Sequence, residues 1–205
     1  DAGHAACQAA STARPAEGNV GAGMGACVGK VFGMDRAMKG GIGTASLTVH
    51  GVTVGALIAC NAVGDVVDPH SGALLAGARS PDGRQLHDTC RALLRGEEPR
   101  PLLAGTNTTI GVIATDARIT KVQAQRLAVV SHDGLARAIR PVHTMSDGDT
   151  LFALGTGLAE HSLGMLTLSA MAAEAVALAT VRAVLAAQSL TTAEGLELPL
   201  SLIHI

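Results

Sequence analysis

The sequence 105-GTNTTIGVIATD-116 lies near the middle of the chain. Its small, polar, turn-prone residues give way at once to an apolar, β-branched run, which predicts a loop that feeds directly into a buried strand. A cut between Asn107 and Thr108 would leave a nucleophilic hydroxyl and a free α-amine on one residue. Because the pKa of an α-amine is roughly 7.7–8.0, this amine could accept the proton of the hydroxyl. On these residues alone, Thr106 and Thr109 are equal rivals of Thr108.

The composition predicts a single domain over residues 1–205. The 205 residues are enough for one well-packed core, and 48% of them are hydrophobic, with two Phe, no Trp and no Tyr. The formal charge of −2 with 16% charged residues gives no indication of nucleic-acid or membrane-surface binding. The most apolar segment, Leu163–Ala187, contains Glu174 and Arg182, so we expect a core helix rather than a membrane span.

Four cysteines are widely spaced and contain no Cys-x-x-Cys pair. We therefore expect free, mostly buried thiols in a reducing, cytoplasmic compartment, in preference to disulfides or a zinc site. The eight histidines are scattered without ligand spacing, so no metal is expected. The cysteines are Cys7, Cys27, Cys60 and Cys90.

Hydrophobic patterning predicts a layered α/β (α+β) protein with helices packed on a sheet. Thr120 is a good N-cap residue, and Val52–Ala62 is apolar enough to be a central strand covered on both faces. Residues 68–100 resemble an exposed excursion, and the apolar tail 196–205 matches no element. In chain order we expect a helix over Ala2–Ala13, strands over Leu47–His50 and Val52–Ala62, a helical patch near Leu86–Leu94, a strand over Ile110–Thr115, a helix from Lys121 to Val130 or on to Ile139, a strand over Leu151–Leu154 and a helix over Leu163–Gln188.

Two glycine-rich segments, residues 17–30 and 39–46, are expected to be loops. The first is not a phosphate-binding P-loop, because Gly29-Lys30 lacks both the glycine five residues before it and the Ser or Thr after it. It fits a relaxed dinucleotide fingerprint, but no strand precedes it. Close backbone packing explains these glycines better, and no cofactor is expected.

Common hydrolase signatures are missing from the sequence. It contains neither a Gly-x-Ser-x-Gly elbow nor a His-Glu-x-x-His zinc helix. Four blocks, however, resemble the P1 family of peptidases, the L-aminopeptidase/D-esterase (DmpA-like) group that also includes the nylon-oligomer hydrolases. They are 18-GNVGAG-23, 38-MKGGIGTAS-46, 55-GALIACNAVGD-65, and 107-NTTI-110 followed by 114-ATD-116.

The resemblance implies an αββα sandwich of the DmpA/ornithine-acetyltransferase-like type and a precursor that cuts itself into two chains. Residues 1–107 would then end the first chain and residues 108–205 would form the second. Thr108 would be the nucleophile and Asn107 the residue released at the cut. Asn61 corresponds to the family's oxyanion-stabilising amide. On its own residues, Asn61 could equally cap the turn at Gly64-Asp65.

The resemblance also assigns Lys39 to positioning or polarising the nucleophile, and it places two carboxylates at the site. Asp147 and Asp149 stand where the aminopeptidase branch has Ser and Glu and where the nylon-oligomer branch has Asp twice. Together with a Thr nucleophile, this pattern favours the nylon-oligomer-like branch. Without the resemblance, 147-DGD-149 would be interpreted as a solvated turn.

The family's chain begins well before the position of Asp1 and includes a site-lining Tyr, so the resemblance predicts a sandwich that is incomplete at its N-terminus. The expected activity is hydrolysis of short peptides or small linear amides through an acyl-enzyme on Thr108. The expected assembly is a homo-oligomer, a tetramer of processed protomers. Two alternatives stay open: an acyltransferase that uses the same self-processed Thr, and an inactive or structural homologue.

Overall fold

The computed structural model describes residues 2–102 and 105–200. Its main sheet has the strand order β3-β4-β7-β9, a smaller sheet has the order β6-β5-β8, and β1-β2 and β10-β11 form two further pairs. The helices and strands are α1 (Ala2–Gln8), η1 (Gly21–Gly23), β1 (Cys27–Val28), η2 (Met34–Arg36), β2 (Met38–Lys39), β3 (Gly41–Val49), β4 (Val52–Cys60), β5 (Asp65–Val67), β6 (Leu74–Ala76), α2 (Thr89–Leu94), β7 (Ile110–Thr115), α3 (Lys121–Ala138), β8 (Ile139–Arg140), β9 (Thr150–Gly155), α4 (Met165–Leu185), β10 (Leu190–Thr191) and β11 (Glu197–Leu198).

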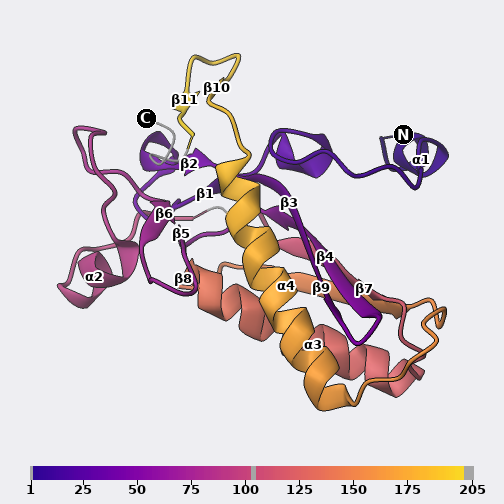
Figure 1. Cartoon of the computed structure of the whole chain (residues 1–205). Helices are drawn as coiled ribbons and strands as arrows, with labels where there is room; N and C mark the ends of the chain where they lie inside the picture. Colours follow the sequence, from indigo (N-terminus) through magenta and orange to yellow (C-terminus); the bar gives the residue numbers. More distant parts are fainter. Residues whose placement is uncertain (1, 103–104, 201–205) are drawn as a thin grey trace.

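The predicted α/β class is confirmed, and the helices lie on one side of the main sheet. Figure 1 shows α3 and α4 side by side across β3, β4, β7 and β9. β3 and β4 form an antiparallel hairpin, β7 pairs antiparallel with β4, and β9 pairs in parallel with β7 after the chain has crossed through α3. A parallel pair needs such a crossover, because a tight turn can only reverse the chain direction.

The opposite face of the main sheet is open, which corrects the expectation that Val52–Ala62 is covered on both faces. Leu57 and Val112 stand between buried neighbours and are 37% and 38% exposed, and Phe152 and Leu154 of β9 are 55% and 47% exposed. The strand over Ile110–Thr115 is likewise buried on one face only. An αββα sandwich places a second sheet against such a face, so the described residues correspond to one αβ half of that arrangement.

Small residues let helix and sheet backbones approach closely. A Cβ atom at Gly43 of β3 would lie 2.0 Å from the carbonyl oxygen of Ala179 in α4. A Cβ atom at Gly134 of α3 would lie 2.3 Å from the carbonyl oxygen of Ala173. Residues 41–46 are therefore part of a strand and not the predicted loop, because their glycines serve close packing rather than a turn.

Both long helices were predicted, with slightly different bounds. α3 begins with a capping box, in which the Thr120 hydroxyl accepts the N–H of Gln123 and the Gln123 side chain accepts the N–H of Thr120. α4 is long and apolar enough to cross a membrane, but 61% of its most apolar window is buried. Its most extensive contacts are with α3, β3 and β4, so it is the expected core helix.

Several short strands were not predicted. In the smaller sheet, β5 lies just before the expected exposed excursion, β6 lies inside it, and β8 lies at the end of the expected helix. The strands β1, β2, β10 and β11 were not expected either. The helical patch near Leu86–Leu94 is real but begins at Thr89, and α1 ends at Gln8 rather than Ala13. Part of the apolar tail forms the β10–β11 hairpin, while residues 201–205 lie outside the described part of the chain.

An ion pair ties the segment before β1 to the last helix. Arg182 of α4 donates two hydrogen bonds, of 2.9 and 2.7 Å, to the carboxylate of Glu17, which also accepts the N–H and hydroxyl of Thr44. The Arg182 hydrogen bonds, assisted by those from Thr44, lower the pKa of Glu17 to about 2. A carboxylate whose pKa falls on folding stabilises the fold above its unfolded pKa, and this contribution disappears as pH falls toward the folded value.

We therefore expect Glu17→Gln to lower the free energy of unfolding at pH 7 by about 1–2 kcal/mol, a value reduced from the full shift because Arg182 is partly exposed. The difference should shrink as pH falls from about 4.5 toward 2. Urea unfolding at pH 7 and pH 3 measures both values, with exposed Glu160→Gln as the control. If the difference in free energy of unfolding between the wild type and Glu17→Gln were the same at pH 3 as at pH 7, the loss of stability would come from altered packing and not from the lost charge.

Candidate active site

The predicted nucleophile, Thr108, lies two residues before the start of β7 and contacts the loop before β9. Thr108 is half-buried between Asn107 and Thr109, which are 1% and 0% exposed. The carbonyl oxygen of Asn107 accepts the N–H of Gly148 at 2.8 Å. A Cβ atom on Gly148 would lie only 2.6 Å from the Thr108 hydroxyl oxygen, so this hydroxyl sits directly against a glycine. The hydroxyl and the carbonyl of the predicted scissile bond thus share one backbone neighbour.

Asn61, just after β4, reaches the same segment from the other side. Its amide nitrogen donates to the carbonyl oxygen of Thr106 at 3.0 Å, and its side-chain oxygen accepts the N–H of Cys27 at 3.1 Å. The described contacts of the side chain therefore go to Cys27, Lys30 and Thr106, and not to the Gly64-Asp65 turn. This places a fixed amide donor within one residue of Asn107.

A lysine that the sequence pattern did not mark as a site residue, Lys30, also contacts this segment. The ammonium of Lys30 donates to the Asn61 side-chain oxygen at 2.9 Å, to the Asn61 carbonyl at 3.1 Å and to the Thr106 carbonyl at 3.3 Å. Lys30 is only 4% exposed, and this burial lowers the pKa of its ammonium to about 8, against the opposing effect of nearby anionic groups that include Asp147 and Asp149. An ammonium surrounded by three acceptors remains mostly charged at neutral pH.

The structure directs Lys39 elsewhere. Its fully buried ammonium donates to the carbonyl oxygens of Gly23, Ala26 and Gly40, at 2.7, 2.8 and 3.0 Å. These acceptors belong to the glycine-rich segment before β1 and to the residue after Lys39. Burial lowers the pKa of this ammonium as well. The three bonds make Lys39 a clamp on the backbone around η1.

Asp147 and Asp149 belong to a hydrogen-bonded loop rather than a plain solvated turn. The carboxylate of Asp147 accepts the N–H of Val63 at 3.3 Å and, from Thr144, the N–H at 3.1 Å and the hydroxyl at 2.7 Å. The carboxylate of Asp149 accepts the N–H of Thr109 at 2.9 Å. One aspartate thus anchors the loop beside Asn61, and the other binds the residue after Thr108.

The Asp149 carboxylate is buried, with its side chain 4% exposed. Burial raises the pKa of Asp149, and the negative charge of Asp147 raises it further, whereas the Thr109 N–H and His143 lower it. A carboxylate in this environment can exchange protons more readily than an ordinary surface aspartate.

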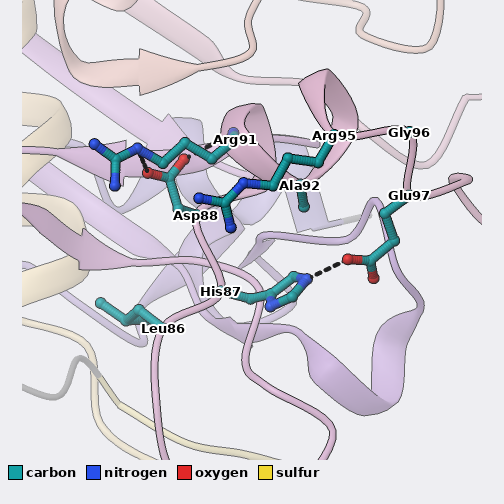
Figure 2. A pocket seen from close by; sticks show the side chains of 8 residues that line it. All are labelled: Leu86, His87, Asp88, Arg91, Ala92, Arg95, Gly96 and Glu97. Carbon is teal, nitrogen blue, oxygen red and sulfur yellow. Dashed lines mark hydrogen bonds and ion pairs between the residues drawn. The ribbon is translucent and has the colours of Figure 1, made fainter.

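In the described part of the chain, neither the cavity beside α2 nor a cluster of metal-binding side chains offers an alternative hydrolase site. The cavity of about 530 Å³ beside α2 contains an ion pair of His87 with Glu97 at 2.5 Å and none of the predicted residues (Figure 2). Within residues 2–102 and 105–200, no three His, Cys, Asp or Glu side chains gather in a way that could hold a metal ion. All four cysteines are free.

The chain is similar to known peptidases and amide hydrolases over most of its length. The family model "Peptidase family S58" matches residues 1–198. An uncharacterized aminopeptidase of Mycobacterium leprae is 41% identical over 91% of this chain and 56% of its own length. A 6-aminohexanoate-oligomer endohydrolase of Kocuria sp. is 33% identical over 85% of this chain and 51% of its own. The chain thus spans about half the length of these relatives.

The fold has a counterpart among solved structures. The L-aminopeptidase D-Ala-esterase/amidase of Ochrobactrum anthropi, described as a variant of the Ntn hydrolase fold, aligns over 94% of this chain and 51% of its own with a TM-score of 0.64 and 24% identity. This likeness establishes the fold, and the family match extends over nearly the whole chain. The chain belongs to peptidase family S58.

Proposed function

We propose that this chain is part of a self-processing amide hydrolase that cuts its own Asn107–Thr108 bond and then uses Thr108 as its nucleophile. The observation that carries the proposal is the pairing of the Asn107 carbonyl with the Gly148 N–H at 2.8 Å, next to the Thr108 hydroxyl. A donor already in place on a carbonyl oxygen stabilises the negative charge that develops there when a nucleophile attacks.

In the proposed self-cleavage, the Thr108 hydroxyl oxygen attacks the Asn107 carbonyl carbon and the bond to the Thr108 nitrogen breaks. The product is an ester between Asn107 and the Thr108 side chain, which water then hydrolyses. We assign the acceptance of the hydroxyl proton to Asp149, whose carboxylate binds the adjacent Thr109. The proton then passes to the departing Thr108 nitrogen, which becomes a free α-amine.

Turnover would repeat this chemistry on a substrate amide. The α-amine of Thr108 takes the hydroxyl proton, the substrate amine leaves, and water hydrolyses the acyl-enzyme. In the uncut chain, Asn61 and Lys30 both donate to the Thr106 carbonyl. Once residues 105–107 are displaced, these two donors are free to bind a substrate carbonyl. Both would then donate hydrogen bonds to the substrate's acyl carbonyl instead of to the Thr106 carbonyl.

The printed names of the relatives support short peptides and small linear amides as substrates, since they include an aminopeptidase and a 6-aminohexanoate-oligomer endohydrolase. A Thr nucleophile with two aspartates favours the nylon-oligomer-like branch. Residues 1–107 and 108–205 would be the two processed chains. We also propose a homo-oligomer of processed protomers, in a reducing, cytoplasmic compartment that keeps the four cysteines free.

Denaturing mass spectrometry of the purified protein tests the proposal. We expect two chains with the masses of residues 1–107 and 108–205, and an N-terminal Thr on the second. Incubation with amino-acid p-nitroanilides and with 6-aminohexanoate oligomers then distinguishes the two substrate classes by the amine released. A folded chain that stays intact after prolonged incubation at neutral pH would refute self-processing.

A further inference from the structure

His143 connects the buried Asp149 carboxylate to the protein surface. Its Nδ1 lies 3.3 Å from the Asp149 carboxylate oxygen that does not bind Thr109. The two oxygens of Asp149 therefore have separate partners, the Thr109 N–H on one and the imidazole on the other. Two such partners fix the orientation of the carboxylate plane as well as its position.

The other side of His143 faces an open surface depression. The imidazole is 39% exposed, whereas the carboxylate that it contacts is 4% exposed. A depression of about 440 Å³ is lined by His143, His132 of α3 and Leu151 of β9, among others, and the two imidazole rings are 5.1 Å apart. His143 is thus in contact with solvent on one side and with a buried acid of the site on the other.

We propose that His143 is a positioning residue that keeps the Asp149 carboxylate ionised and correctly oriented beside Thr108, a role that rests on the proposed self-processing function. A protonated imidazole at 3.3 Å stabilises the carboxylate anion against the effect of burial. The neutral imidazole can still donate one hydrogen bond, so orientation survives the loss of charge.

The charges around this pair come from three parts of the chain. Asp147, on the same loop, disfavours ionisation of Asp149, while Lys30, after β1, favours it. On α3, His132 acts on Asp149 in the same direction as His143, and Asp133 acts on His132. Among the described histidines, His143 is the one whose imidazole contacts the Asp149 carboxylate directly, at 3.3 Å, so its removal should have the largest effect among the histidines.

The backbone at His143 decides which replacement is informative. Its φ is +54°, in the left-handed region that Asn tolerates better than most residues. His143→Asn therefore removes the positive charge but keeps a neutral donor and a compatible backbone. His50→Asn is a matched control, because His50 also has a left-handed φ of +47° but lies in the β3–β4 turn, outside this cluster.

The experiment follows the Thr109 amide proton by NMR in an uncut Thr108→Ala chain, because this N–H donates to Asp149 and reports its ionisation without requiring activity. Relative to Thr108→Ala alone, adding His143→Asn should move the titration midpoint of this amide up by about 0.5–1 pH unit, and adding His50→Asn should leave it unchanged. With Thr108 intact, His143→Asn should shift the acid limb of the self-cleavage rate by the same amount.

An unchanged Thr109 midpoint in the His143→Asn chain would overturn the proposal, as would an equal shift caused by His50→Asn. An intact wild-type chain combined with a shifted midpoint would separate the two hypotheses: the coupling of His143 to Asp149 would stand, and the self-processing function would fail. A lower midpoint would mean that His143 destabilises the carboxylate, which also contradicts the proposal. A simple loss of fold stability would not move the midpoint.

Discussion

Thr108→Ala is expected to leave the chain as a single uncut species and to lower amide hydrolysis by about 10⁴-fold or more, because it removes the atom that would form both proposed esters. This substitution deletes the hydroxyl and the γ-methyl group of Thr108, and it leaves the backbone of the loop in place. The Asn107 carbonyl and the Gly148 N–H that it accepts are backbone groups and remain. Denaturing mass spectrometry and an amine-release assay on the same preparation measure the two losses together.

Thr108→Ser is the matched variant, since it keeps the hydroxyl and removes one methyl group. We expect it to be cut at a rate within about tenfold of the wild type. Thr106 and Thr109 provide the comparison with the two rival hydroxyls. The Thr109 residue is buried and contacts Asp149 through its backbone N–H rather than its hydroxyl, so Thr109→Val should still be cut. Two results would contradict Thr108 as the nucleophile. One is self-cleavage of the Thr108→Ala chain, and the other is loss of self-cleavage in Thr106→Ala with Thr108 intact.

Elements with local signals were predictable from the sequence. The Thr120 N-cap and the long apolar run of α4 depend on residues within a few turns of helix, and both helices were expected near their observed positions. The loop-to-strand change at Ile110 was visible in the same way. Such features are determined by neighbours along the chain, which a single sequence contains.

Elements that depend on distant partners were not predictable. Val66 of β5 pairs with Ile139 of β8, and a three-residue strand has little pattern of its own. The glycines of β3 resemble a loop until α4 lies against them at backbone distance. The open face of β4 and β7 likewise depends on what lies across the sheet, and the pattern of one strand does not contain that information.

Dependence on distant partners also explains why Lys30 was not predicted as a site residue. Lys30 ends one glycine-rich segment and Lys39 begins the next, and the family block around Lys39 drew attention to it. A long side chain, however, acts where its ammonium ends, and the Lys30 ammonium reaches Thr106, which is 76 positions further along the chain. The available signal was a lone lysine with apolar residues on both sides, Val28 and Val31-Phe32, which suggests a buried cation that must have partners.

Lys30→Met should slow self-cleavage by about 100-fold, the equivalent of roughly 2.7 kcal/mol in activation free energy, because it removes a charged donor from Asn61 and Thr106. Lys39→Met is the matched variant of similar shape. It leaves three buried carbonyl oxygens without their donor, so we expect a loss of folding stability of several kcal/mol, while the fraction that folds is still cut. Urea unfolding and mass spectrometry on both variants separate stability from cleavage.

The pH dependence gives the Lys30 prediction a second test. The pKa of Lys30 is lowered to about 8 by burial, so its ammonium form is present below that pH and is lost as pH rises through it. If the charged form assists cleavage, the wild-type rate should fall above about pH 8, and Lys30→Met should lack this alkaline limb. The opposite result, a rate that increases through pH 8, would make Lys30 a proton acceptor. If Lys39→Met folded but stayed uncut while Lys30→Met was cut normally, the lysine that assists self-cleavage would be Lys39 and not Lys30.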